Sequence, residues 1–289
     1  MTRTEHACAC FLRACELDVA VRKPGNVSLA SPGHGMQAAM FLASAQAAVG
    51  PLFEAGAQVG ERIETAVSAT WTVAGCNTNL GILLLCAPIA RAVEMSPDSR
   101  APAALQAAIE AVLADLDVTD AAAAYRASAR ANPGGLGRVP SQDVLRPPSI
   151  DLRAAMALAA PRDSIARQYR DGFADLFTLG LPALGTGFSL PFNGVDVAAV
   201  QRLYLRLLSG FADSHIVRNH GEAVAHIVMT AAQAWDDRAA QAQALQADAD
   251  LGGEFAAWDE ALKLARINPG TTADLTVATL LIAGLSGPA

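Results

Sequence analysis

Apolar residues return every three or four positions in almost every segment of this 289-residue chain. Val200, Leu203, Leu207 and Phe211 illustrate the spacing, which places apolar side chains on one face of an α-helix. The alternation of β-branched and polar residues that marks half-buried strands is nearly absent. The sequence therefore predicts an all-α fold.

We expect one globular domain over residues 1–289, with about 12 helices, because no shift in composition marks a boundary. The chain is 52% apolar and 17% charged, enough to build a sizeable core. Three long segments rich in Gly and Pro, residues 24–35, 132–148 and 180–194, interrupt the helices, and loops of this length are often functional. The predicted helices span residues 4–21, 36–49, 52–72, 78–95, 102–114, 119–131, 151–159, 163–178, 195–211, 219–246, 254–265 and 272–285.

Charge and composition favour a protein that acts on small molecules. The net charge is -7, and the 21 Lys and Arg residues form no run, so the sequence lacks the basic patch of a nucleic-acid-binding protein. We find no signal peptide and no apolar stretch long enough to span a bilayer. The five cysteines are odd in number and contain no C-x-x-C, which indicates reduced thiols and a cytoplasmic location.

A polar hexapeptide from Cys76 to Gly81 precedes the apolar run 82–87. Asn77, Thr78 and Asn79 are typical of helix starts, where free backbone N–H groups attract anions. Gly81 would allow close approach of a ligand to the backbone. Taken alone, the motif is equally typical of a well-capped buried helix.

Two further segments repeat this pattern of polar residues around a turn. Lys23, Gly25 and Asn26 belong to a Lys-Pro-Gly-Asn turn that supplies a cation and an amide. The segment Asn-Pro-Gly-Thr-Thr-Ala-Asp at 268–274 contains Thr271, Thr272 and Asp274. Thr271 and Asp274 also have the spacing of a capping box, which would explain both structurally. The repeated pattern makes a phosphate-rich ligand the leading hypothesis.

Two histidines have chemistry to contribute. His34 lies in a Gly-rich loop before a helix, where its imidazole could reach a ligand. His215 belongs to the segment 213–218, which also carries Asp213 and Arg218. Asp213 is a candidate Mg²⁺ ligand and Arg218 a candidate phosphate ligand. The alternative for this segment is a surface turn between helices with a local ion pair.

The order of these motifs resembles the triphosphoribosyl-dephospho-CoA synthase family. The resemblance extends from about Leu17 to Leu285 and includes Asn-Pro-Gly-Gly-Leu-Gly at 132–137. The pattern is similar to a divergent branch found in archaea and C1-metabolising bacteria. The motifs that carry it are Lys-Pro-Gly-Asn at 23–26, Asn-Thr-Asn-Leu-Gly at 77–81, Asp-Ser-His-Ile-Val-Arg at 213–218 and Asn-Pro-Gly-Thr-Thr-Ala-Asp-Leu at 268–275.

The resemblance implies an all-α transferase that joins C1′ of the ATP ribose to the ribose 2′-hydroxyl of dephospho-CoA and releases adenine. It implies Asp213 and Asp274 as Mg²⁺ ligands or catalysts, and His215 or His34 as the proton donor to adenine. The remaining candidate contacts to triphosphate and ribose are Lys23, Gly25, Asn26, Asn77, Thr78, Asn79, Arg218, Thr271 and Thr272.

The chain departs from the citrate-lyase members of the family at four positions. Ser28 and Gly35 replace two acids, and Asn79 and Leu80 replace a histidine and a lysine. Three alternatives therefore stay open. The first is an ATP-using enzyme of another cofactor pathway, including C1-carrier biosynthesis. The second is a kinase or nucleotidyl transferase, and the third is a nucleotide-binding protein without catalysis.

Overall fold

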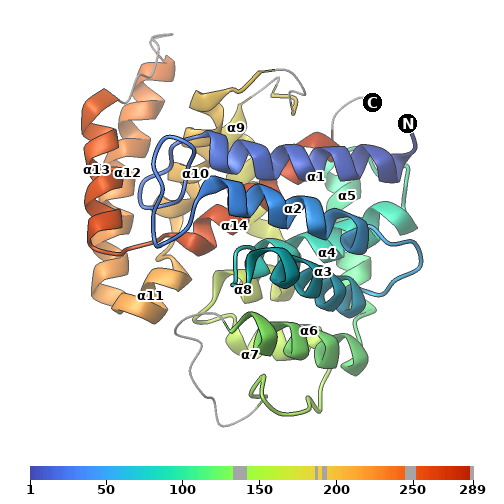
Figure 1. The fold of residues 1–289 in the computed structure, drawn as a ribbon. Coiled ribbons are helices and arrows are strands. Elements are labelled where there is room, and N and C mark those ends of the chain that lie inside the picture. The colour runs from blue at the N-terminus through green and yellow to red at the C-terminus, as the bar shows by residue number, and fades with distance from the viewer. Residues whose placement is uncertain (133–141, 186–187, 191–193, 245–251, 287–289) are drawn as a thin grey trace.

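The computed structural model describes residues 1–132, 142–185, 188–190, 194–244 and 252–286. Over these residues the chain forms fourteen α-helices and one π-helical turn, with no strand, which confirms the all-α prediction (Figure 1). The helices are α1 (Arg3–Ala20), α2 (Ala38–Leu52), α3 (Val59–Ala74), α4 (Leu80–Met95), α5 (Pro102–Ala114), α6 (Val118–Ala131), α7 (Leu152–Ala159), α8 (Ser164–Arg170), the π-turn η1 (Leu176–Gly180), α9 (Leu181–Leu184), α10 (Val197–Gly210), α11 (Ser214–His220), α12 (Glu222–Ala244), α13 (Gly252–Leu264) and α14 (Gly270–Leu285).

Helices α4 and α14 form the centre of the molecule. Each buries twelve of its sixteen residues, because both are apolar around nearly their whole circumference. The hydroxyls of Thr276 and Thr279 in α14 donate to backbone carbonyls one turn back, so burial leaves neither unpaired. α1 packs against both central helices, and α2 lies beside α1 (Figure 1).

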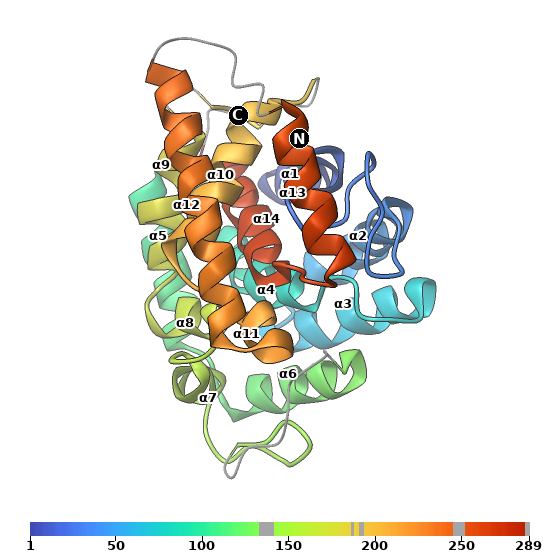
Figure 2. The ribbon, with the colours of Figure 1, turned by 90° about the vertical axis from the view of Figure 1, so that its left-hand side faces the viewer.

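The buried apolar residues form two separate cores. The larger core surrounds α4 and α14 and takes side chains from α1 to α9. The smaller core lies among α10, α11, α12 and α13, where Trp235 stacks on Trp258 with ring centroids 6.2 Å apart. Helix α10 joins the two cores, with Leu203 and Leu207 in the larger core and Leu205 and Leu208 in the smaller. Figure 2 shows α11, α12 and α13 together on one side of the molecule.

The helix boundaries differ most from the sequence prediction at three places. Where a helix over 52–72 was predicted, α2 continues to Leu52 and α3 begins only at Val59. The predicted helix 163–178 ends at Arg170, since Gly172 and Phe173 have φ of 62° and 59°. The predicted helix 219–246 is preceded by the separate helix α11, and Gly221, at φ 86°, divides α11 from α12. The expectation of a plain surface turn at 213–218 is therefore wrong, because these residues begin a helix.

Two further expectations concern cysteines and membranes. All five cysteines are free thiols, and Cys10, Cys15 and Cys86 are buried. None of the helices within the described residues is both long and apolar enough to cross a membrane.

Arg62 links the segment before α3 to α4 by hydrogen bonds, and its substitution tests the fold. Its side chain is 1% exposed and donates to the carbonyls of Ala57 and Leu52 and to the carboxylate of Glu94. Because Arg62→Met leaves the carbonyls of Ala57 and Leu52 without this donor, it should lower the free energy of unfolding by about 3 kcal/mol, although Glu94 keeps its bonds from Gly56 and Arg91. Chemical denaturation measures this loss.

The matched control is Arg126→Met. Arg126 forms a similar two-bond pair with Glu64, but on the surface. Exposed pairs contribute at most about 1 kcal/mol. Equal losses in the two variants would contradict the structural role given to Arg62.

Candidate active site

The four sequence motifs meet at the starts of α4, α11 and α14. The turn at Gly25 packs against Pro269, and a Cβ at Gly25 would lie 2.8 Å from the Cδ of Pro269. Next to this contact, the side-chain amide of Asn26 donates to Oδ1 of Asn268 at 3.0 Å. Gly25 has φ 78°, so the close approach and the turn both require glycine here.

Asp213 joins the start of α11 to the start of α14. Its Oδ1 caps α11 by accepting from the backbone N–H of His215 and Ile216, at 2.8 and 3.1 Å. Its Oδ2 accepts from both the backbone N–H and the hydroxyl of Thr272, each at 2.7 Å. Asp213 is fully buried, so its carboxylate is occupied by the fold rather than presented to a ligand.

The start of α4 meets the first turn of α14 at Gly81. A Cβ on Gly81 would lie 2.0 Å from Oδ2 of Asp274, so only glycine leaves room for that carboxylate. Asn77 Oδ1 accepts from the backbone N–H of Leu80, the first residue of α4, at 3.1 Å. The predicted close approach at Gly81 is thus made by Asp274 from within the chain. Asn79 is buried, and its Nδ2 has no hydrogen-bond partner among the described residues.

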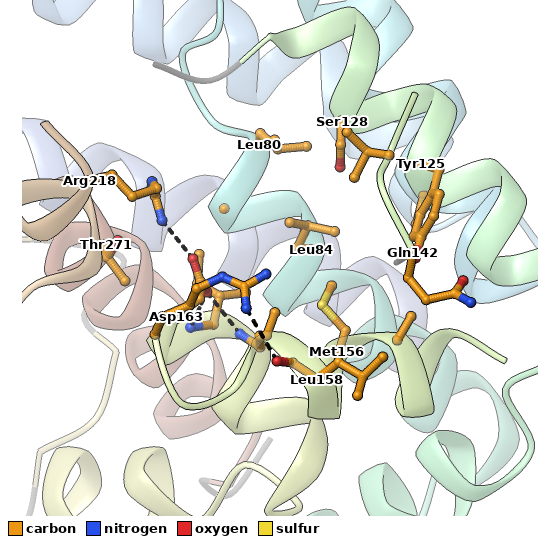
Figure 3. A pocket seen from close by; sticks show the side chains of 18 of the residues that line it. Leu80, Leu84, Tyr125, Ser128, Gln142, Met156, Leu158, Asp163, Arg218 and Thr271 are labelled. Atoms are coloured by element: carbon orange, nitrogen blue, oxygen red, sulfur yellow. Dashed lines mark hydrogen bonds and ion pairs between the residues drawn. The ribbon is translucent and has the colours of Figure 1, made fainter. Parts of the chain in front are cut away.

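A pocket of about 360 Å³ lies beside this junction (Figure 3). Arg218, Thr271 and Asp163 lie on one side of it, and Tyr125, Ser128 and Gln142 lie on the opposite side. Apolar side chains from α4, α6, α7 and α8 form the wall between. The lining comprises Asn77, Leu80, Gly81, Leu84, Ala124, Tyr125, Ser128, Gln142, Asp143, Val144, Leu152, Ala155, Met156, Leu158, Ala159, Arg162, Asp163, Ile165, Ala166, His215, Val217, Arg218, Thr271 and Asp274. We call it the main pocket.

Asp274 is the unneutralised acid of the main pocket. Its carboxylate forms no hydrogen bond or ion pair within the described part of the chain, whereas Asp163 pairs with Arg218 at 2.6 Å. Burial raises the pKa of Asp274 well above its usual range, and the nearby carboxylates of Asp18 and Asp213 raise it further, while Arg218 lowers it. The carboxyl group of Asp274 is therefore held where a cation or a proton would be favourable.

His215 lies between the main pocket and a second pocket. The second pocket is lined by His34, Met36, His215, Asn219, His220, Arg266 and Asn268. Burial, with the positive charges of Arg218, His34 and His220, lowers the pKa of His215 to about 4. The imidazole is therefore neutral near pH 7. No hydrogen bond to its ring nitrogens forms within the described residues.

The main pocket is lined by five of the predicted site residues, Asn77, His215, Arg218, Thr271 and Asp274. His34 lines the second pocket instead and bonds the carbonyl of Gly25 through Nε2 at 2.8 Å. The capping-box alternative for Thr271 and Asp274 is wrong, because α14 already begins at Gly270 and no side chain caps it. Thr78 bonds the hydroxyl of Ser44 at 2.7 Å, outside both pockets.

Lys23 does not line either pocket. It is fully buried, and its ammonium group pairs with the carboxylate of Asp18 at 2.9 Å and donates to Asn26 Oδ1 at 3.1 Å. The Lys23 ammonium group, which the sequence suggested as a phosphate ligand, is therefore already paired inside the fold. The segment 133–137 of the resemblance lies outside the described residues.

The sequence analysis missed the far side of the main pocket. Tyr125, Ser128 and Met156 are spaced like helix core residues, so no local pattern distinguishes them. Asp163 precedes α8 and caps it by accepting from the backbone N–H of Ile165 and Ala166. The sequence could have indicated Asp163 by its position at a helix start. Its pairing with Arg218 depends on tertiary structure and could not be predicted.

The fold and the pocket define an all-α protein with a pocket of mixed polar and apolar lining. A family model described as CitG, ATP:dephospho-CoA triphosphoribosyl transferase, matches residues 4–289, and the chain belongs to this family of transferases. The resemblance and the enzyme class expected from the sequence are thereby confirmed. The chemistry of the family is transfer of the triphosphoribosyl-dephospho-CoA synthase type.

One solved structure supports the fold. It comes from Archaeoglobus fulgidus, and triphosphoribosyl-dephospho-CoA synthase activity has been provisionally assigned to that protein. The similarity has a TM-score of 0.61 at 24% identity, and it covers 86% of this chain and 98% of the other. A comparison with curated proteins gives no match.

Opposite effects on stability should separate Asp274 from Asp213. Since the folded protein raises the pKa of Asp274, its ionisation in the folded state opposes folding above the pKa of the unfolded carboxyl group. Asp274→Asn should therefore raise the melting temperature at pH 8. The gain should shrink as the pH falls towards 4, where the wild-type carboxyl group is protonated.

Asp213→Ala should instead lower the free energy of unfolding by about 3 kcal/mol, because it leaves the buried donors of Thr272, His215 and Ile216 unpaired. Thermal melts of both variants from pH 4 to 8 make the comparison. A destabilising Asp274→Asn at pH 8 would contradict the assignment of an unneutralised carboxyl group.

Proposed function

We propose that this chain transfers the triphosphoribosyl group of ATP to a hydroxyl of a dephospho-CoA-type acceptor and releases adenine in the main pocket. The observation that carries the proposal is the meeting of three motifs, 77–81, 213–218 and 268–275, at one pocket with a polar and an apolar side, while the fourth motif, 23–26, packs against Asn268 and Pro269. Membership of the transferase family supports the same chemistry.

The two sides of the main pocket suit the two parts of ATP. Arg218, Thr271 and the start of α4 offer donors to phosphate oxygens, and helix starts favour negative charge. Leu84, Met156 and Tyr125 offer an apolar surface to a purine ring. ATP in this orientation would place its ribose near Asp274.

The residues present fit a magnesium ion at Asp274. Mg²⁺ is commonly held by one or two carboxylates, with substrate phosphates and water completing its coordination. Asp274 has no partner among the described residues, and burial together with the carboxylates of Asp18 and Asp213 raises its pKa, so a cation beside it would be favourable. When bound, Mg²⁺ would reduce the repulsion between Asp274 and the triphosphate. Asp213 is assigned a positioning role, because its two oxygens are occupied by α11 and α14.

The transfer breaks the bond from ribose C1′ to adenine and forms a bond from C1′ to the acceptor oxygen. The acceptor hydroxyl loses a proton and the departing adenine gains one, so the reaction balances without another reactant. His215 is neutral near pH 7 and lies on the wall of the main pocket. A neutral imidazole suits acceptance of the hydroxyl proton better than the donation to adenine that the sequence suggested.

Incubation with Mg-ATP and dephospho-CoA should release adenine in a ratio of one to each acceptor consumed. Asp274→Asn should reduce kcat/KM by at least about 100-fold, because the triphosphate loses its counterion site. Liquid chromatography of the nucleobase and nucleotides measures the outcome.

Asp237→Asn is the control, since Asp237 is an exposed aspartate of α12 outside both pockets. Recovery of ADP or AMP in place of adenine would reject the proposed transfer and favour a kinase or nucleotidyl transferase. ATP binding without any product would favour the non-catalytic alternative.

A further inference from the structure

The second pocket has the side chains of an anion site. Its described lining contains one arginine, three histidines, two asparagines and Met36, and no acid. This composition is unusual in a chain of net charge -7. Guanidinium, imidazole and amide groups are the side chains that donate to phosphate oxygens. The pocket therefore favours an anionic ligand.

Arg266 projects from a backbone position that favours glycine. It follows α13 at φ 59°, in the left-handed conformation that commonly ends a helix and that glycine adopts without strain. Its side chain has no hydrogen bond or ion pair in the described part of the chain. Because Arg266 is exposed and its side chain is unpaired within the described residues, its guanidinium is open to a ligand at the pocket that it lines.

His34, from the loop before α2, also has a positive φ. Its φ is 55°, and His34 and Arg266 are the two residues of the pocket lining that have a positive φ. Its Nε2 lies 2.8 Å from the carbonyl of Gly25, and Nε2 of His220 lies 3.0 Å from the carbonyl of Arg266. Because a carbonyl only accepts, each Nε2 carries the hydrogen. Both rings are thereby fixed in orientation, and Nδ1, the remaining polar atom, donates to an anion when the ring carries both hydrogens.

One acid that contacts the segment 24–35, which carries His34, is already neutralised. Asp259 is fully buried and pairs with Arg22 at 2.8 Å and with Lys263 at 2.9 Å. Its other oxygen accepts from the backbone N–H of Gly25. Asp259 therefore fixes the turn at Gly25 and places no unpaired negative charge beside the second pocket.

His215 forms a wall shared by the two pockets. A transfer between two substrates needs the donor and the acceptor on adjoining sites, with the reacting atoms close to one catalytic group. The main pocket accounts for the donor in the proposed function. The second pocket has no role in that assignment.

We propose that the second pocket binds the phosphate chain of the acceptor substrate, with Arg266, His34 and His220 as its ligands. This inference rests on the proposed function for the identity of the acceptor. The assignment of an anion site stands on the pocket itself. It predicts that the enzyme selects acceptors that carry a phosphate or diphosphate group, and that the same compound without phosphate is a poor substrate.

Two substitutions at Arg266 test the site while controlling for folding. Arg266→Gly removes the guanidinium and relieves the strained φ, so its melting temperature should equal or exceed that of the wild type. Arg266→Ala removes the same group but keeps the strain. Both variants should bind inorganic diphosphate about tenfold or more weakly in isothermal titration calorimetry. Arg130→Ala, at an exposed arginine of α6, is the control and should bind as the wild type does.

Kinetics then identify the ligand that uses the site. Arg266→Gly should raise the KM for dephospho-CoA about tenfold or more and leave the KM for ATP unchanged. A raised KM for ATP alone would show that the pocket serves the donor and would overturn the acceptor assignment. Unchanged diphosphate binding in both Arg266 variants would overturn the anion site itself. Loss of diphosphate binding without adenine release by the wild type would support the anion site and reject the proposed function.

Discussion

The hydrogen bonds around Asp213 are the constraint on which the site depends. They join the start of α11, which carries His215 and Arg218, to the start of α14, which carries Thr271 and Asp274. A buried carboxylate is costly unless it is well bonded, and here four donors meet it. Fixing these two helix starts together sets the positions of a neutral imidazole, a guanidinium and a carboxyl group at one pocket.

The same junction shows how the chain distributes charge between folding and chemistry. Asp213, Asp259 and Lys23 are fully buried and fully partnered. Asp274 is also placed against the centre of the molecule, but its carboxylate has no such partners in the part of the chain that the structure describes. Unneutralised groups of this kind are concentrated at functional sites, where a ligand completes the interactions that the fold leaves open.

The sequence was sufficient for the fold class because apolar residues return at helical spacing in almost every segment, and strand-like alternation is nearly absent. It was insufficient for α11, since seven polar-rich residues have no apolar periodicity and Gly221 was not recognised as a break. The motifs predicted that distant segments form one site, and the contact of Gly81 with Asp274 agrees with that expectation.

The individual side chains were predicted less well, because a pattern cannot tell an internal partner from a ligand. Lys23 has the residue type of a phosphate ligand, but Asp18 lies five residues before it and neutralises it inside the fold. Conversely, Tyr125 and Met156 look like core residues in the sequence, and only the separation of α6 and α7 from α4 makes them a pocket wall.

The presence of two hydrophobic cores has a consequence for local unfolding. Helix α11 packs into the smaller core through Ile216, whereas α4 and α6 belong to the larger core. A ligand in the main pocket touches both groups of helices at once, so its binding energy opposes their separation. A ligand in the main pocket therefore makes the two cores unfold together more readily than separately. Helices α12 and α13 gain stability from this ligand although they do not contact it.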